Sequence, residues 1–85
     1  MNELILINIS GQDKPGLTSS ISRLLGDYDV DVLDIGQAVI HSYLTLGILI
    51  RVPPQAESSP LLKDVLFRAH ELGVTVRFTP VEGSS

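Results

Sequence analysis

The chain has 85 residues, with six basic and ten acidic side chains, a formal net charge of −4 and no cysteine. This length fits a single domain with a thin core. The absence of cysteine excludes disulfide-stapled folds, cysteine-ligated zinc and thiol catalysis, and the acidic balance argues against nucleic acid and anionic membrane surfaces as partners. No apolar run approaches the roughly 20 residues of a membrane span and no secretory signal is recognisable, so we expect a cytoplasmic protein.

The first part of the chain predicts a strand, a loop and a helix. Residues 4–9 are an apolar run rich in β-branched residues, which is typical of a buried strand. Residues 10–16 follow as a loop, in which Asp13 is the candidate N-cap of the helix and Pro15 fits its first turn. Gly26 marks the end of this helix. Its predicted apolar face comprises Leu17, Ile21, Leu24, Leu25 and Tyr28.

Two strands are predicted in the middle of the chain. Residues 30–41 are strand-like but mixed, with Gly36 at their centre, and a strand glycine often marks a bulge or a close backbone approach. His41 and Ser42 are predicted to form a tight turn, and residues 43–52 then alternate with period two until two prolines end the strand. The aliphatic face of this strand is expected under the helices and comprises Leu44, Leu46, Ile48, Ile50 and Val52.

The last part of the chain predicts a second helix and a final strand. Ser59 is the candidate N-cap, Pro60 suits the first helical position, and Gly73 is the expected stop. The predicted buried face comprises Leu62, Val65, Leu66 and Ala69. Residues 74–79 alternate as a strand that ends at the following proline, and residues 82–85 have the composition of a tail or linker.

The element order β-α-β-β-α-β is that of the ferredoxin-like fold, an α+β architecture. It predicts a four-stranded antiparallel sheet with both helices on one face. The opposite face of the sheet then stays bare. On the third strand this face carries Tyr43, Gly47 and Leu49, which are only half polar, so it is a surface suited to association.

The patterns of catalytic and metal sites are weak in this sequence. Asp29 and Asp31 match the paired aspartates of haloacid-dehalogenase-type phosphatases only superficially, because Leu33 stands where a threonine or valine is required and too little chain follows. His41 and His70 lack the spacing of a metal-ligand pair. No serine-nucleophile elbow is present, and the aromatic and basic residues of RNA-binding domains are missing. We therefore expect no catalytic residue, metal or cofactor in this chain.

The loop at residues 11–17, Gly-Gln-Asp-Lys-Pro-Gly-Leu, is the remaining candidate site. The backbone N–H groups at the start of a helix, together with the helix dipole, favour a carboxylate or phosphate. Asp13 beside them can accept from an ammonium group, and an amino acid carries both groups on one carbon. The alternative is that Asp13 only caps the helix and the glycines only permit the turn.

Residues 7–18, Ile-Asn-Ile-Ser-Gly-Gln-Asp-Lys-Pro-Gly-Leu-Thr, resemble the opening of an ACT domain, a small regulatory module that senses amino acids. Residues 32–41, Val-Leu-Asp-Ile-Gly-Gln-Ala-Val-Ile-His, and residues 44–49 look like the N-terminal ACT domain of bacterial phosphoserine phosphatases. The resemblance covers residues 3–81 and implies an ACT domain over residues 1–81.

This resemblance implies a homodimer in which ACT domains pair side by side. The amino acid then lies between the first loop of one protomer and the second strand of the other. Serine is the amino acid that the resemblance favours. Positions 13 and 31 are asparagine in the serine-sensing ACT domains of phosphoglycerate dehydrogenase. Because the aspartates here cannot donate to a ligand carboxylate, they imply either a reversed ligand orientation or loss of binding. The implied ligand-binding residues are Asp13, Pro15, Gly16, Leu17, Asp31 and Gln37.

The enzyme that carries such a domain hydrolyses L-phosphoserine with Mg²⁺ in the last step of serine biosynthesis. Its catalytic aspartates and its Mg²⁺ would belong to a C-terminal phosphatase domain that these 85 residues do not contain. The chain is then either the regulatory domain of such an enzyme, with the phosphatase domain as its partner, or a free-standing ACT protein. A ligand-independent dimerisation module of the same enzyme is the alternative function.

Overall fold

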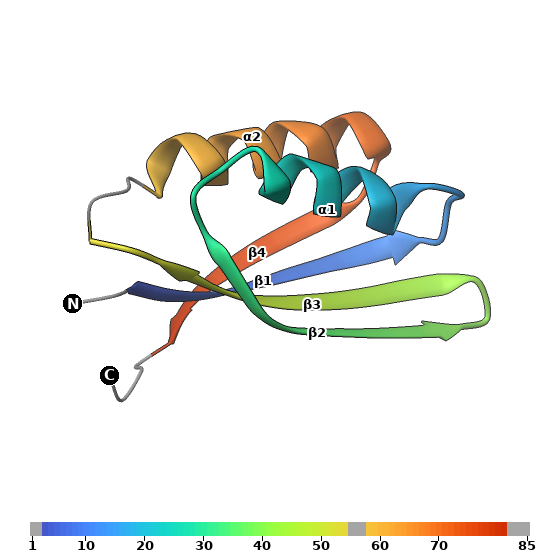
Figure 1. Cartoon of the computed structure of the whole chain (residues 1–85). Coiled ribbons are helices and arrows are strands. Elements are labelled where there is room, and N and C mark those ends of the chain that lie inside the picture. The colour runs from blue at the N-terminus through green and yellow to red at the C-terminus, as the bar shows by residue number, and fades with distance from the viewer. Residues whose placement is uncertain (1–2, 55–57, 82–85) are drawn as a thin grey trace.

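Two helices cover one face of a four-stranded sheet (Figure 1). The computed structural model describes residues 3–54 and 58–81, so the predicted tail at 82–85 lies outside the described residues. The strand order is β2-β3-β1-β4, and every neighbouring pair is antiparallel. This arrangement confirms the predicted ferredoxin-like fold. The elements in chain order are β1 (Glu3–Gln12), α1 (Leu17–Gly26), β2 (Asp31–Ile40), β3 (Tyr43–Val52), α2 (Ser59–Leu72) and β4 (Thr75–Val81).

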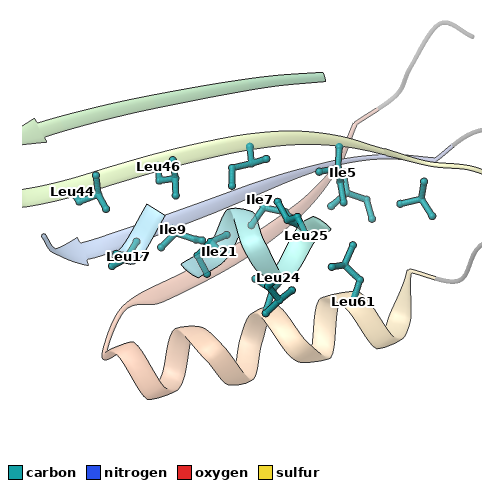
Figure 2. Packing of buried hydrophobic residues seen from close by; sticks show 14 residues of the cluster. Ile5, Ile7, Ile9, Leu17, Ile21, Leu24, Leu25, Leu44, Leu46 and Leu61 are labelled. Carbon is teal, nitrogen blue, oxygen red and sulfur yellow. The ribbon is translucent and has the colours of Figure 1, made fainter. Parts of the chain in front are cut away.

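The core lies between the sheet and the helices, and alternation along two central strands builds most of it. The predicted aliphatic face of β3 is buried throughout, and Ile5, Ile7 and Ile9 of β1 lie beside it on the same face. Figure 2 shows these side chains directed toward α1 and α2. The four leucine and isoleucine residues predicted for the buried stripe of α1 are all in the core, and Tyr28 packs against its edge.

The buried stripe of α2 differs from the predicted one. Leu61 is completely buried with Val65 and Ala69 at four-residue spacing, whereas Leu66 is 54% exposed and Leu62 is only partly buried. Leu66 instead lines a groove between α2 and β4, where the sheet ends and no further described strand covers it. The helix also begins one residue early, with Ser58 rather than Ser59 at the N-cap position. It ends as predicted at Gly73, which adopts the left-handed conformation.

Helix α1 begins without a side-chain cap, so the predicted capping role of Asp13 is wrong. The N-cap position is Gly16, with φ of 81°, and no side chain caps the helix. The backbone N–H of Asp13 donates to the carbonyl oxygen of Ser42 at 2.9 Å, which keeps this residue beside the β2–β3 turn. Pro15 correspondingly precedes the helix instead of lying in its first turn. Gly16 has the left-handed backbone conformation, which glycine adopts without a Cβ clash.

Strand β2 has its irregularity at Leu33. The pairing register shifts between Val32 and Asp34, which leaves Leu33 as the extra residue of a bulge. Gly36, the position that the sequence suggested for a bulge, lies in regular register opposite Gly47 of β3. A bulge therefore does not explain the glycine at position 36.

Strand β1 continues to Gln12, three residues into the predicted loop at 10–16, whereas the β2–β3 turn and β4 lie close to their predicted positions. The predicted tight turn at His41 and Ser42 is present, and both residues have positive φ, at 49° and 67°. Strand β4 extends to Val81, one residue past the expected end at Pro80. The proline is tolerated because β4 is an edge strand, on which one row of backbone groups has no neighbouring strand to bond.

Candidate functional site

The loop between β1 and α1 is anchored to two other elements. Asp13 bonds through its backbone to the β2–β3 turn, as described above. Lys14 donates from Nζ to the carbonyl oxygen of Leu72 at 2.8 Å, so its charge meets the C-terminal end of α2. A cation at this end of a helix is favoured by the helix dipole. The sequence did not predict that Lys14 anchors the loop to α2. Its only signal was a basic residue within the candidate loop.

Two backbone N–H groups at the start of α1 have no hydrogen-bond partner among the described residues. The N–H of Leu17 donates to the carbonyl oxygen of Lys14 at 3.2 Å, and the N–H of Ser20 donates to that of Gly16 at 2.8 Å. The N–H groups of Thr18 and Ser19 have no hydrogen-bond partner in the part of the chain that the structure describes. Two adjacent free donors at the positive end of a helix suit a carboxylate.

Gln37 lies next to this loop within the same chain. Thr18 donates from Oγ1 to Oε1 of Gln37 at 2.9 Å, which joins the start of α1 to β2. Gln37 stands opposite the buried Leu46 and therefore lies on the helix side of the sheet. The structure thus brings Gln37 together with the predicted residues of the loop, through a contact of Thr18 that the sequence did not reveal.

Asp31 lies at the far end of β2 from the loop. It begins this ten-residue strand, and Ile40 ends it at the turn, which is roughly 30 Å along an extended strand. Its Oδ2 accepts from Arg51 Nη2 at 2.8 Å and from Arg51 Nε at 3.2 Å, on the open face of the sheet. A single chain therefore does not bring Asp31 to the other candidate residues. The alternation of residues 43–52 in the sequence predicts that Arg51 lies on the open face. The sequence does not show that Asp31 is its partner, because this depends on the pairing register of β2 with β3.

The outer edge of β2 is unpaired and unusually apolar. Among the strands that the structure describes it bonds only to β3, and all ten of its residues are exposed. A long edge strand of this kind is a template for pairing with another chain. Its large hydrophobic residues are 44–75% exposed and comprise Val32, Leu33, Ile35, Val39 and Ile40.

Other chemistry is sparse in the described residues. Over residues 3–54 and 58–81, no group of three or more histidine, aspartate or glutamate side chains is placed to hold a metal ion. The same part of the chain has no helix with the length and apolar character needed to cross a membrane. Away from the loop, the Tyr28 hydroxyl donates to Asp64 of α2. This hydrogen bond, aided by desolvation and by the negative charges of Asp64 and Asp27, raises the pKa of Tyr28 above 10.0.

Comparison with known proteins agrees with this architecture. A family model described as an ACT domain matches residues 3–79. The chain belongs to the ACT domain family. This ACT domain is similar to an ACT domain protein from Streptococcus pneumoniae, with a TM-score of 0.78 at 19% identity over 92% of this chain and 89% of that one. At this identity the likeness supports the fold alone.

Two relatives of this ACT domain differ greatly in length. The chain is 37% identical over 73 residues to phosphoserine phosphatase SerB2 of Mycobacterium tuberculosis, a match that covers 85% of this chain and 18% of that protein. It is 29% identical over 73 residues to a UPF0237 protein of Methanocaldococcus jannaschii, covering 85% of this chain and 81% of that protein. The chain therefore spans less than a fifth of the phosphatase but most of the UPF0237 protein.

Proposed function

We propose that this ACT domain is a regulatory module that binds an amino acid, with serine as the first candidate, between two copies of the chain. The observation that carries the proposal is the edge of β2, which is exposed along its whole length and ends beside a loop with free backbone donors. Pairing of two such edges would bury their apolar residues and satisfy their backbone groups.

A twofold β2–β2 pairing would also bring Asp31 to the end of the partner's β2 that adjoins the loop. In an antiparallel pair centred near Ile35 and Gly36, the beginning of one strand lies opposite the end of the other. Asp31 of the partner subunit would then lie near Ile40, at the end of the strand that adjoins the loop. The large separation of Asp31 from Asp13 within one chain is what such an interface site requires.

The free groups favour one ligand orientation. Carboxylates accept hydrogen bonds but do not donate them when ionised, so Asp13 and Asp31 suit the ligand ammonium. Oδ2 of Asp31 bonds to Arg51, and Oδ1 has no hydrogen-bond partner among the described residues. The N–H groups of Thr18 and Ser19 suit the ligand carboxylate. Aspartates at positions 13 and 31 imply either that the ligand binds in the reversed orientation or that it does not bind. This arrangement favours the reversed orientation.

The relatives of this chain support two proposals for the protein to which it belongs. The identity of 37% to a mycobacterial phosphoserine phosphatase supports a regulatory domain of such an enzyme in L-serine biosynthesis, with catalysis and Mg²⁺ in a separate C-terminal domain. The match over 81% of a UPF0237 protein supports the alternative of a free-standing ACT protein. In both cases the proposed role of this chain is regulation.

Thermal unfolding in the presence of each of the twenty amino acids tests the proposal. A ligand at 100 times its dissociation constant stabilises the folded state by about 2.7 kcal/mol. For a domain of this size, that is roughly a 10–20 °C rise in melting temperature. The Asp13→Ala variant should lose the rise. No shift with any amino acid at millimolar concentration would contradict ligand sensing.

A ligand-independent dimerisation module is the second candidate function. The ion pair between Asp31 and Arg51 favours it, because Arg51 already offsets the charge of Asp31 in the absence of a ligand. Sedimentation equilibrium with and without serine separates the two functions, since a serine-insensitive dimer supports only the second. A chain that stays monomeric at all concentrations would contradict both.

A further inference from the structure

The open face of the sheet carries a small open cavity, separate from the loop, whose lining residues are mostly polar. Figure 1 shows that both helices lie on the other side of the sheet. The cavity has a volume of about 260 Å³ and is lined by side chains of β1, β3 and β4. Its polar lining residues are Asn8, Ser10, Thr45, Thr75 and Arg77.

The strand register explains why these five side chains converge. Asn8 of β1 stands opposite Arg77 of β4, and Ser10 stands between Thr45 of β3 and Thr75 of β4. Residues that face each other across antiparallel strands point to the same side of the sheet. Since the intervening residues of β1 are buried under the helices, the five polar side chains share the open face in two adjacent rows.

A pair of glycines leaves the floor of the sheet bare beside this cavity. Gly47 lies opposite Asn8, and Gly36 lies opposite Gly47 in the next strand. A Cβ atom would meet nothing within 4 Å at Gly36, and at Gly47 only Asn8 Oδ1 at 3.7 Å. Neither residue has positive φ, so backbone conformation does not require glycine there. Strand glycines destabilise the folded state, and these two leave room for a close approach.

Arg77 is the charged residue that lines this cavity, and it is exposed. Arg77 has no carboxylate within 4.0 Å among residues 3–54 and 58–81, where the ion pairs are Asp31–Arg51 and Arg68–Glu71. The other polar residues that line the cavity supply one amide and three hydroxyl groups, which can donate hydrogen bonds but carry no charge. A guanidinium in this setting selects an oxyanion that it can bind through two parallel hydrogen bonds.

We propose that this cavity binds a small hydroxylated molecule that bears one carboxylate or phosphate group. Arg77 holds the oxyanion, and Asn8 with the three hydroxyl groups bonds to the rest of the ligand. At about 260 Å³ the cavity lies just below the range of roughly 300–1,000 Å³ for ligand pockets, so it suits only a small ligand. The cavity is separate from the proposed amino-acid site, because it lies on the other side of the sheet from Gln37 and the start of α1, does not include Asp31, and uses one chain only.

Chemical-shift titration of the ¹⁵N-labelled chain tests the proposal, with inorganic phosphate and glycerate as separate probes at constant ionic strength. We expect saturable shifts, with at least one probe, at the backbone amides that line the cavity. Arg77→Gln should weaken binding about tenfold or more, because a hydrogen bond to a charged group is lost. Arg23→Gln on the helix layer removes the same charge elsewhere and should leave the affinity unchanged. The probe that saturates at lower concentration identifies the oxyanion.

Shifts that do not saturate with either probe would overturn the proposal, as would equal weakening by Arg77→Gln and Arg23→Gln. If Arg77→Gln fails to fold, Thr75→Val provides the decision, because it keeps a β-branched side chain and removes one hydroxyl. It should weaken binding by about three- to tenfold, and an unchanged affinity would count against the site. Repeating the titration with Asp13→Ala should give the native result, so failure of the amino-acid site leaves this test intact.

Discussion

Replacing Ile35 with lysine at the centre of β2 is expected to weaken association of two chains strongly. Ile35 is 48% exposed in the single chain. Complete burial of an isoleucine side chain stabilises by about 1.5–3 kcal/mol, so the exposed half contributes about 0.7–1.5 kcal/mol for each protomer when the edges pair. Both protomers lose it, which gives about 1.5–3 kcal/mol for the dimer and about a 10–150-fold higher dissociation constant. Lysine adds to this loss because two like charges would meet near the twofold axis.

Sedimentation equilibrium over a range of protein concentrations measures this change. The matched control is Leu66→Lys, which introduces the same side chain at a position that is 54% exposed on α2, away from β2. The control should dimerise like the native chain, and circular dichroism should show that both variants are folded. Equal dissociation constants for the native chain and Ile35→Lys would refute pairing through β2.

Three further substitutions test separate parts of the structure. Asp13→Ala should change the free energy of unfolding without ligand by less than about 0.5 kcal/mol in urea, because Asp13 caps no helix; a larger loss would restore the capping role. Ile21→Ala removes a completely buried side chain and should cost about 2–5 kcal/mol in the same assay, whereas a loss below about 1 kcal/mol would contradict the packing of α1. In the folded state the hydrogen bond to Asp64 raises the pKa of Tyr28 above 10.0. The protonated hydroxyl therefore stabilises the folded state fully below pH 10.0, and this stabilisation is lost as the pH rises through the raised pKa. The stability of the native chain should therefore fall more steeply above that pH than the stability of Tyr28→Phe, and parallel curves would refute the shift.

The sequence predicts an element well where one face is entirely apolar and the other is not. In β3 the alternation is unambiguous, and the structure buries every aliphatic residue that it indicated. In α2 two adjacent pairs of apolar residues, Leu61 with Leu62 and Val65 with Leu66, are compatible with more than one buried stripe. The periodicity alone does not choose between these stripes. The choice depends on where the sheet ends beside β4, which is a property of the tertiary structure.

The sequence located the loop of the candidate site but not the contacts around it. The motif at residues 11–17 identified the loop, because glycine and proline before an apolar helical stripe mark the start of a helix, where backbone N–H groups are available to a ligand. The hydrogen bond from Thr18 to Gln37 and the ion pair of Asp31 with Arg51 join residues 19 and 20 positions apart. Such pairs depend on the strand register and on the bulge at Leu33, for which the sequence carries no marker.

The open face of the sheet was predicted to be bare, and its polar cavity emerged only from the register. Alternation shows which residues of one strand share a face, but not which residues of its neighbours lie opposite. The pairing of Asn8 with Arg77 and of Gly36 with Gly47 was therefore out of reach of the sequence.

The central claim is that one ligand contacts two chains, the loop of one protomer and Asp31 of the other. Mixing two binding-deficient variants, Asp13→Ala and Asp31→Ala, tests it by calorimetry with the amino acid that stabilises the native chain. In a mixed dimer, one of the two sites keeps both aspartates. Random exchange should therefore restore about a quarter of the native binding capacity, since half of the dimers are mixed and each has one intact site. Each variant alone should bind nothing, and a mixture that also binds nothing would contradict a site shared between two chains.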